Sequence, residues 1–199
     1  SSHALDEETA RAEIYGLLSQ LYYAAPSAEL LGQLQVAVTE APDAGGFLEE
    51  PWRELVASAR SLSQAQISAE YNSLFGGVGK PEVYLFGSHY LSGFLNEKPL
   101  VRLRDDLAEL GLARSEGMSE TEDHVAYGFE VMRFLIAGDD VAVSNLTRQQ
   151  AFFTQHVQSW LPALCQVLQS QPRAVFYARV AAFTEAFISV ESQGFDLVA

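Results

Sequence analysis

The chain has 199 residues, of which 48% are hydrophobic, and this length and composition fit one domain with a substantial core. Its 26 acidic residues exceed its 12 basic residues and give a formal net charge of −14. Such a charge argues against binding of nucleic acid, because a phosphate backbone is held by Lys and Arg side chains. The single cysteine, Cys165, excludes an intramolecular disulfide and any metal site with several cysteine ligands.

Signals for membrane insertion or export are missing from the sequence. No apolar run approaches the roughly 18 residues that cross a bilayer. The first residues do not show the basic and then apolar pattern of a secretory signal. We therefore expect a cytoplasmic protein without membrane insertion. Residues 1–9 are expected to form an N-terminal tail, derived in part from cloning, and residues 10–199 a single domain.

Apolar residues recur with the spacing of amphipathic helices along most of the chain. The expected helices follow residues 10–22, 30–38, 52–59, 67–75, 100–110, 125–136, 152–168 and 176–190. No stretch alternates convincingly with a period of two, so a sheet is not expected. The prediction is an all-α fold, a single globular helical domain of about eight helices with an irregular aromatic loop around residues 76–99.

Two helix starts carry a recognisable capping pattern, in which a serine is followed three residues later by Gln or Glu. Ser63 with Gln66 forms the first predicted capping box. Ser119 with Glu122 forms the second, which predicts that a helix begins directly after Ser119.

The stretch from Glu70 to Tyr90, EYNSLFGGVGKPEVYLFGSHY, is the first of two segments with functional information. It ends a helix at Gly76-Gly77 and continues as an aromatic loop. Its rings either fill core or line an apolar groove. An apolar groove with a few polar groups is typical of a peptide or ligand site.

The second segment contains Glu120, Asp123 and His124, which in a helix would lie on the polar face. These residues either stabilise the positive end of the helix or offer carboxylates to the arginines of a partner. One alternative is a helical metal-dependent hydrolase that uses the same three residues. Another is a nucleotide-binding regulator that uses residues 76–80, GGVGK, although this segment lacks the Ser or Thr and the preceding strand of a phosphate loop.

Four motifs in series resemble the TorD/DmsD/NarJ family, the cytoplasmic maturation chaperones of molybdenum-containing redox enzymes. An acid, an aromatic residue and Leu-Phe are matched by Glu70, Tyr71, Leu74 and Phe75. A glycine-proline loop with aromatic residues and a serine is matched by Gly79, Pro81, Phe86, Gly87, Ser88 and Tyr90. An acid followed by Asp-His is matched by Glu120, Asp123 and His124. A downstream Phe-x-x-His and Trp are matched by Phe153, His156 and Trp160.

The resemblance covers residues 10–191 with order and spacing preserved, and it departs from the family pattern at two places. Thr121 stands where the family usually has proline. Tyr84-Leu85 replaces a proline pair that is common in the loop. These departures bear on the shape of the groove and therefore on the choice of client.

The resemblance implies a non-enzymatic, system-specific chaperone with an all-helical TorD-like domain. It would bind the apo-form or the twin-arginine signal peptide of a molybdenum-containing redox enzyme and assist cofactor insertion and assembly before export. The partner would be the catalytic subunit with its N-terminal leader. The candidate residues for client and leader binding are Tyr71, Leu74, Phe75, Tyr84, Phe86, Ser88, Tyr90, Glu120, Asp123 and His124.

No metal and no permanently bound cofactor are expected of such a chaperone. Weak binding of a guanine nucleotide and a transient contact with the molybdenum cofactor are the expected small-molecule interactions. The loop at residues 76–99 would be the hinge if two chains exchanged segments, so we expect a monomer or a domain-swapped dimer.

Overall fold

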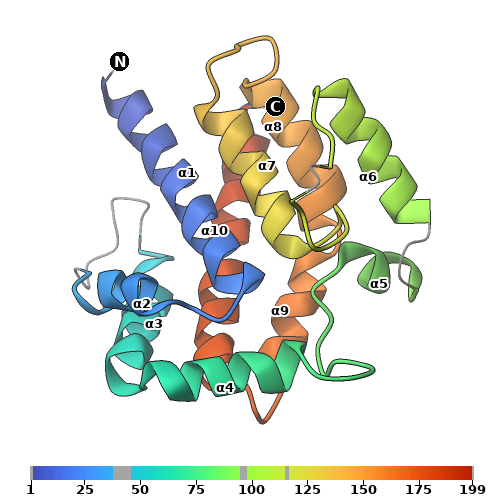
Figure 1. The fold of residues 1–199 in the computed structure, drawn as a ribbon. Coiled ribbons are helices and arrows are strands. Elements are labelled where there is room, and N and C mark those ends of the chain that lie inside the picture. The colour runs from blue at the N-terminus through green and yellow to red at the C-terminus, as the bar shows by residue number, and fades with distance from the viewer. Residues whose placement is uncertain (1, 38–45, 95–97, 115–116, 199) are drawn as a thin grey trace. The chain divides into compact units, whose positions relative to one another are not determined.

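The computed structural model describes residues 2–37, 46–94, 98–114 and 117–198, and these ranges contain helices and turns without a strand (Figure 1). The prediction of an all-α fold is confirmed. Ten α-helices and one π-helical segment lie in the described ranges, where about eight helices were expected. The chain divides into two compact units, one made of Ser1–Tyr23 and Leu85–Leu161, the other of Ala24–Tyr84 and Pro162–Ala199. None of the described helices is long and apolar enough to span a membrane.

The first unit is built on the packing of its first helix against a helix from the middle of the chain. Its elements are α1 (Ser2–Tyr23), α5 (Gly87–Ser92), α6 (Lys98–Glu109), α7 (Val125–Ala137), α8 (Leu146–Phe152) and the π-helical segment η1 (Phe153–Gln158). Figure 1 shows α1 alongside α7. The buried rings of Tyr15 and Tyr22 lie 6.0 and 5.8 Å from the ring of Phe129. Because α1 begins at Ser2, the residues expected as a tail continue the first helix.

The second unit is built around the last and longest helix. Its elements are α2 (Ala28–Gln35), α3 (Glu49–Ser61), α4 (Gln64–Phe75), most of α9 (Leu161–Ser170) and α10 (Phe176–Val198). α10 packs against α3 and α4, and the rings of Trp52 and Phe183 lie 5.3 Å apart. The capping box predicted at the start of α4 is present, with Ser63 and Gln66 exchanging hydrogen bonds.

Glu70, the first residue of the family-like motif in α4, caps the start of α10. Its carboxylate accepts the backbone N–H groups of Val175, Phe176 and Tyr177 at 3.0, 3.0 and 2.7 Å. These N–H groups have no partner within the helix, and the positive end of a helix favours a negative charge. The acid of the motif therefore has a structural role, which is to join α4 to α10.

The region expected to be irregular, residues 76–99, contains a helix, and the prediction is corrected there. α5 occupies Gly87–Ser92 and ends at Gly93, whose φ of 80° is a left-handed conformation that glycine adopts easily. Upstream, Gly77 and Gly79 have φ of 100° and 94°. Residues 95–97 of the predicted loop lie outside the described residues.

Candidate functional site

A pair of backbone hydrogen bonds joins the loop before α5 to the turn before α7. The N–H of Gly87 donates to the carbonyl of Asp123 at 2.9 Å, and the N–H of Val125 donates to the carbonyl of Leu85 at 2.8 Å. Phe86 and His124 thus face each other in an isolated antiparallel bridge. In the first unit the structure therefore brings together four of the predicted residues: Phe86, Ser88, Asp123 and His124.

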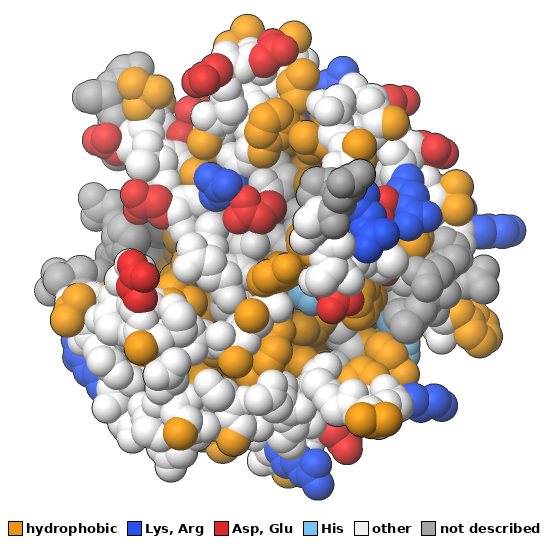
Figure 2. All heavy atoms as spheres, in the orientation of Figure 1, with side chains coloured by type: hydrophobic (Ala, Val, Ile, Leu, Met, Phe, Trp, Pro, Cys, Tyr) orange, Lys and Arg blue, Asp and Glu red, His pale blue; other side chains and the backbone are white. Residues whose placement is uncertain are grey.

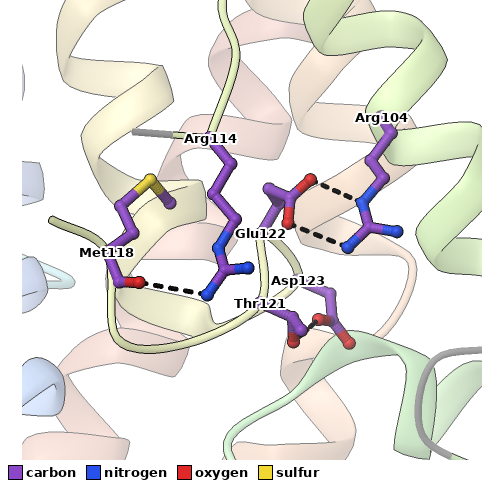
Figure 3. Close-up of polar contacts among 6 residues, drawn as sticks. All are labelled: Arg104, Arg114, Met118, Thr121, Glu122 and Asp123. Atoms are coloured by element: carbon purple, nitrogen blue, oxygen red, sulfur yellow. Dashed lines mark hydrogen bonds and ion pairs between the residues drawn. The ribbon is translucent and has the colours of Figure 1, made fainter. Parts of the chain in front are cut away.

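Asp123 holds this junction through its side chain. Its Oδ2 accepts the backbone N–H of Ser88 at 3.2 Å and also the Ser88 hydroxyl. Its Oδ1 accepts the hydroxyl of Thr121 at 2.6 Å, a contact drawn in Figure 3. The side chain is 7% exposed, so the carboxylate serves mainly to fix the start of α5. Thr121, which departs from the family's usual proline, contributes a hydroxyl that proline lacks.

His124 caps the start of α7. The prediction that this helix starts directly after Ser119 is therefore wrong. The Nδ1 atom of His124 accepts the N–H of Ala126 at 3.1 Å, so His124 is the N-cap of a helix that begins at Val125. Residues 119–123 precede the helix, and the acids among them that could have capped it, Glu122 and Asp123, are bonded to Arg104 and Ser88 instead. The predicted polar helix face of Glu120, Asp123 and His124 is accordingly a turn.

The imidazole of His124 is neutral near pH 7. Burial lowers its pKa to about 4, and the nearby charge of Asp123 offsets this only in part. With Nδ1 acting as an acceptor, the ring proton is on Nε2, which is then the available donor. The rings of Phe86, Tyr127 and Tyr23 surround the imidazole at centroid distances of 5.1, 5.6 and 6.3 Å.

Glu122 forms an ion pair that was not predicted from the sequence. Instead of capping a helix, it accepts two hydrogen bonds from Arg104 of α6, at 2.6 Å to Nε and 3.2 Å to Nη2 (Figure 3). These hydrogen bonds are the main reason that the pKa of Glu122 lies below its usual value. Arg104 and Glu122 are separated by 18 residues in the chain, so no pattern among neighbouring residues predicts their ion pair.

Glu120 is the third acid of this segment, beside Glu122 and Asp123. The residue is half-buried, and its backbone N–H donates to the Tyr127 hydroxyl at 3.3 Å. Among the described residues, no side chain or backbone group is bonded to its carboxylate. Glu120 is therefore the acid best placed to receive a cation from outside.

The predicted residue Tyr90 belongs to a second anchor of α5. Its ring stacks on the indole of Trp160 at 5.6 Å and 20°. A Cβ atom on Gly87 would lie 2.9 Å from the same indole, so this position requires glycine. The indole N–H donates to the carbonyl of His156 at 2.8 Å, and His156 Nε2 lies 2.5 Å from Asp106 Oδ2 of α6. Trp160, which follows η1, thus packs against α5, and His156 of η1 accepts its indole N–H and contacts α6.

The remaining predicted residues lie in the second unit. The rings of Tyr71 and Phe75 are 4.9 Å apart, and both contact Tyr177 edge-on, at 5.6 and 5.2 Å. Leu74 is fully buried in the core, whereas Tyr84 is half-buried. The candidate residues are therefore divided between the two units rather than gathered in one.

Neither alternative function gains support from the described residues. Within them, no group of three or more His, Cys, Asp or Glu side chains is arranged to hold a metal ion. The only cysteine, Cys165, is buried, which raises the pKa of its thiol. The GGVGK segment follows α4, not a strand, so it has no phosphate-loop architecture.

Comparison with known proteins identifies the family. The profile of the family described as "Nitrate reductase delta subunit" matches residues 42–166. The chaperone protein TorD of Aliivibrio fischeri (strain ATCC 700601 / ES114) is 27% identical over 198 residues, which cover 91% of this chain and 92% of that protein. The chaperone protein TorD of Vibrio cholerae serotype O1 (strain ATCC 39541 / Classical Ogawa 395 / O395) is 26% identical over 202 residues, or 94% and 92% of the two chains. The chain therefore belongs to the nitrate reductase delta subunit family, the TorD/DmsD/NarJ group, and is a system-specific molybdoenzyme maturation chaperone rather than an enzyme.

Proposed function

We propose that the chain acts in the cytoplasm by binding the N-terminal leader of a molybdoenzyme catalytic subunit. It holds the apo-form of that subunit until the molybdenum cofactor has been inserted. The observation that carries this proposal is the junction of α5 with the turn before α7. There, half-buried aromatic rings lie in one continuous set of contacts with Glu120, whose carboxylate has no partner among the residues that the structure describes.

This set of contacts can be followed from residue to residue. The Glu120 N–H is bonded to Tyr127, the Tyr127 ring lies 5.6 Å from His124, and His124 contacts Phe86 edge-on at 5.1 Å. An arginine of the leader would pair with Glu120, since a guanidinium matches a carboxylate in two hydrogen bonds. The Nε2–H of His124 would donate to a carbonyl of the leader backbone.

The other candidate residues take supporting or apolar roles in the proposal. Ser88 and Asp123 hold the two segments together, and Phe86 and Tyr90 offer aromatic surface. In the second unit, Tyr71, Phe75 and Tyr84 are half-buried and offer further aromatic surface, while Leu74 supports them from the core.

The charge of the chain suits a leader that carries two arginines. With a formal net charge of −14, the protein attracts a cationic peptide at long range, which raises the rate of encounter. Apolar contacts then determine how long the complex lasts. The expected interactions with a guanine nucleotide and with the molybdenum cofactor, and the expected monomer or domain-swapped dimer, stay predictions.

A double-mutant cycle tests the role of Glu120. The Glu120→Gln variant keeps the shape of the side chain but loses its charge, and it should bind the client leader about tenfold more weakly, in line with a charge-assisted hydrogen bond. A leader with its two arginines replaced by glutamine should bind the wild-type protein more weakly too. Binding is measured by isothermal titration calorimetry.

The decisive quantity in this cycle is the coupling between the two changes. If Glu120 receives an arginine, the Gln leader should lose less affinity for the Glu120→Gln variant than for the wild-type protein. Glu109→Gln, at the exposed end of α6, is the matched control and should bind as the wild-type protein does. Strictly additive losses would show that Glu120 does not contact the arginines.

A further inference from the structure

The first unit contains an apolar cavity of about 340 Å³ that none of the predicted site residues lines. It lies between α6, the segment that follows it, α7 and Phe152 of α8. Its wall is mainly aliphatic and aromatic, with Leu103, Leu107, Leu112 and Val131 among the lining residues. The volume is within the range of ligand pockets, and since an apolar cavity of roughly 150 Å³ accepts a benzene ring, this one holds roughly two groups of that size.

A glycine inside α7 keeps this cavity open. Gly128 lines the cavity, and its N–H is bonded to the carbonyl of His124 as part of the helix. A Cβ atom built on Gly128 would meet no atom within 4 Å apart from the backbone of its own helix and its chain neighbours. Glycine weakens a helix relative to alanine, and nothing in the packing forbids a side chain here. Position 128 thus has a residue that weakens the helix, and the space that a side chain would occupy there belongs to the apolar cavity.

Each charged side chain that lines the cavity is hydrogen-bonded within the protein, so an ionic ligand is not needed to neutralise it. Glu122 is paired with Arg104, and Glu130 accepts hydrogen bonds from Arg133 at 2.7 and 3.0 Å. The guanidinium of Arg114 donates to the carbonyl of Met118 at 3.0 Å (Figure 3). Along the same wall, Phe134 of α7 is 38% exposed, and Figure 2 shows hydrophobic side chains at the surface over α7.

We propose that this cavity binds the apolar stretch of the client leader, taking about two of its hydrophobic side chains over Gly128. The inference rests on the proposed function and places the apolar part of the leader between α6 and α7. Its connection to the cation site is Tyr127, which lines the cavity and whose hydroxyl accepts the Glu120 N–H. The cation site and the apolar cavity are thus adjacent, as the arginines and the apolar stretch are in a leader.

The charge of the chain favours a leader over other apolar occupants. A second copy of this chain also carries a net charge of −14 and would be repelled by the first, and an anionic membrane would be repelled in the same way. A cationic peptide with an apolar stretch is the partner that both the charge and the cavity fit.

The test is to fill the cavity with a side chain and measure leader binding. Gly128→Leu places an aliphatic group in the open space. Gly194→Leu is the matched control, because Gly194 is also inside a helix, α10, and a Cβ atom there would also have nothing within 4 Å. The probe is the complete synthetic leader of a molybdoenzyme catalytic subunit from the organism that encodes this chain, titrated by calorimetry.

The expected result is that the Gly128→Leu variant keeps the thermal midpoint of the wild-type protein or exceeds it and binds the leader at least about tenfold more weakly. Gly194→Leu should bind normally. A leader with its apolar stretch replaced by serine should lose affinity for the wild-type protein and much less for Gly128→Leu. If Gly128→Leu does not fold, Phe134→Gln, which removes an exposed apolar wall, replaces it in the same cycle.

The outcomes separate this inference from the proposed function. Normal leader binding by Gly128→Leu, or equal losses with the serine leader in both proteins, would overturn the cavity as the binding site while leaving leader binding intact. A wild-type protein that binds no leader at all would overturn both.

Discussion

At the scale of single residues, His124 combines a structural and a proposed binding role. As the N-cap of α7 it must keep Nδ1 unprotonated, and its burial ensures this by lowering the pKa to about 4. The neutral ring can still donate through Nε2. A motif residue that looks like a charged group in the sequence is therefore a neutral donor in the folded protein.

The depressed pKa of His124 predicts a pH dependence of stability. The unfolded chain takes up the proton near pH 6.5 and the folded protein only near pH 4, so the free energy of unfolding falls as the pH drops through this window. The loss due to His124 alone is about 3 kcal/mol and levels off below the lower value. His124→Asn keeps a capping acceptor without titrating, so its unfolding free energy should fall less steeply between pH 6.5 and 4. Denaturant unfolding at a series of pH values measures both slopes, and parallel slopes would contradict the account.

At the scale of elements, Glu70 explains why an acid begins the first family-like motif. Its carboxylate receives three N–H groups at the start of α10, so the motif joins two helices of the second unit. Tyr71 and Phe75 then pack against Tyr177 of the helix that Glu70 caps. The aromatic residues of this motif are thus oriented by the capped end of α10.

Replacing Glu70 should weaken the connection between α4 and the start of α10. Glu70→Gln removes the negative charge and one of the two acceptor oxygens, and it should lower the free energy of unfolding by about 1–3 kcal/mol, as for other hydrogen bonds to charged groups. Glu82→Gln is the control, because Glu82 is exposed and its ion pair with Arg173 is long, at 3.8 Å. It should change stability by less than about 0.5 kcal/mol. Equal effects of the two changes in denaturant unfolding would show that the cap does not stabilise the fold.

Helices could be predicted from the sequence where the residues that determine them are close together in the chain. The capping box at Ser63 and the apolar stripes are examples, because residues three and four apart share a helix face. The start of α7 was not predictable. The acids that looked like a helix cap are taken by Thr121, Ser88 and Arg104, and two of these partners are distant in the chain. The helix α5 was missed for the same reason, since Asp123 and Trp160 fix it from outside the segment.

At the scale of the whole molecule, the family resemblance predicted more of the candidate site than residue patterns did. Spacing alone could not relate Ser88 to Asp123, which the fold joins by hydrogen bonds. The motif series placed both in one set. It could not reveal that the candidate residues are divided between two compact units, because that division depends on contacts between distant parts of the chain. It also gave no indication of the cavity beside Gly128.

Leader binding itself is best tested by titrating the wild-type protein with the leader of a molybdoenzyme catalytic subunit from the same organism, followed by calorimetry at low and at high salt. We expect saturable binding that weakens as salt screens the attraction between the acidic protein and the cationic leader. A leader of the same composition in scrambled order should bind far more weakly. The absence of any heat with the native leader and with the complete apo-subunit would contradict the account.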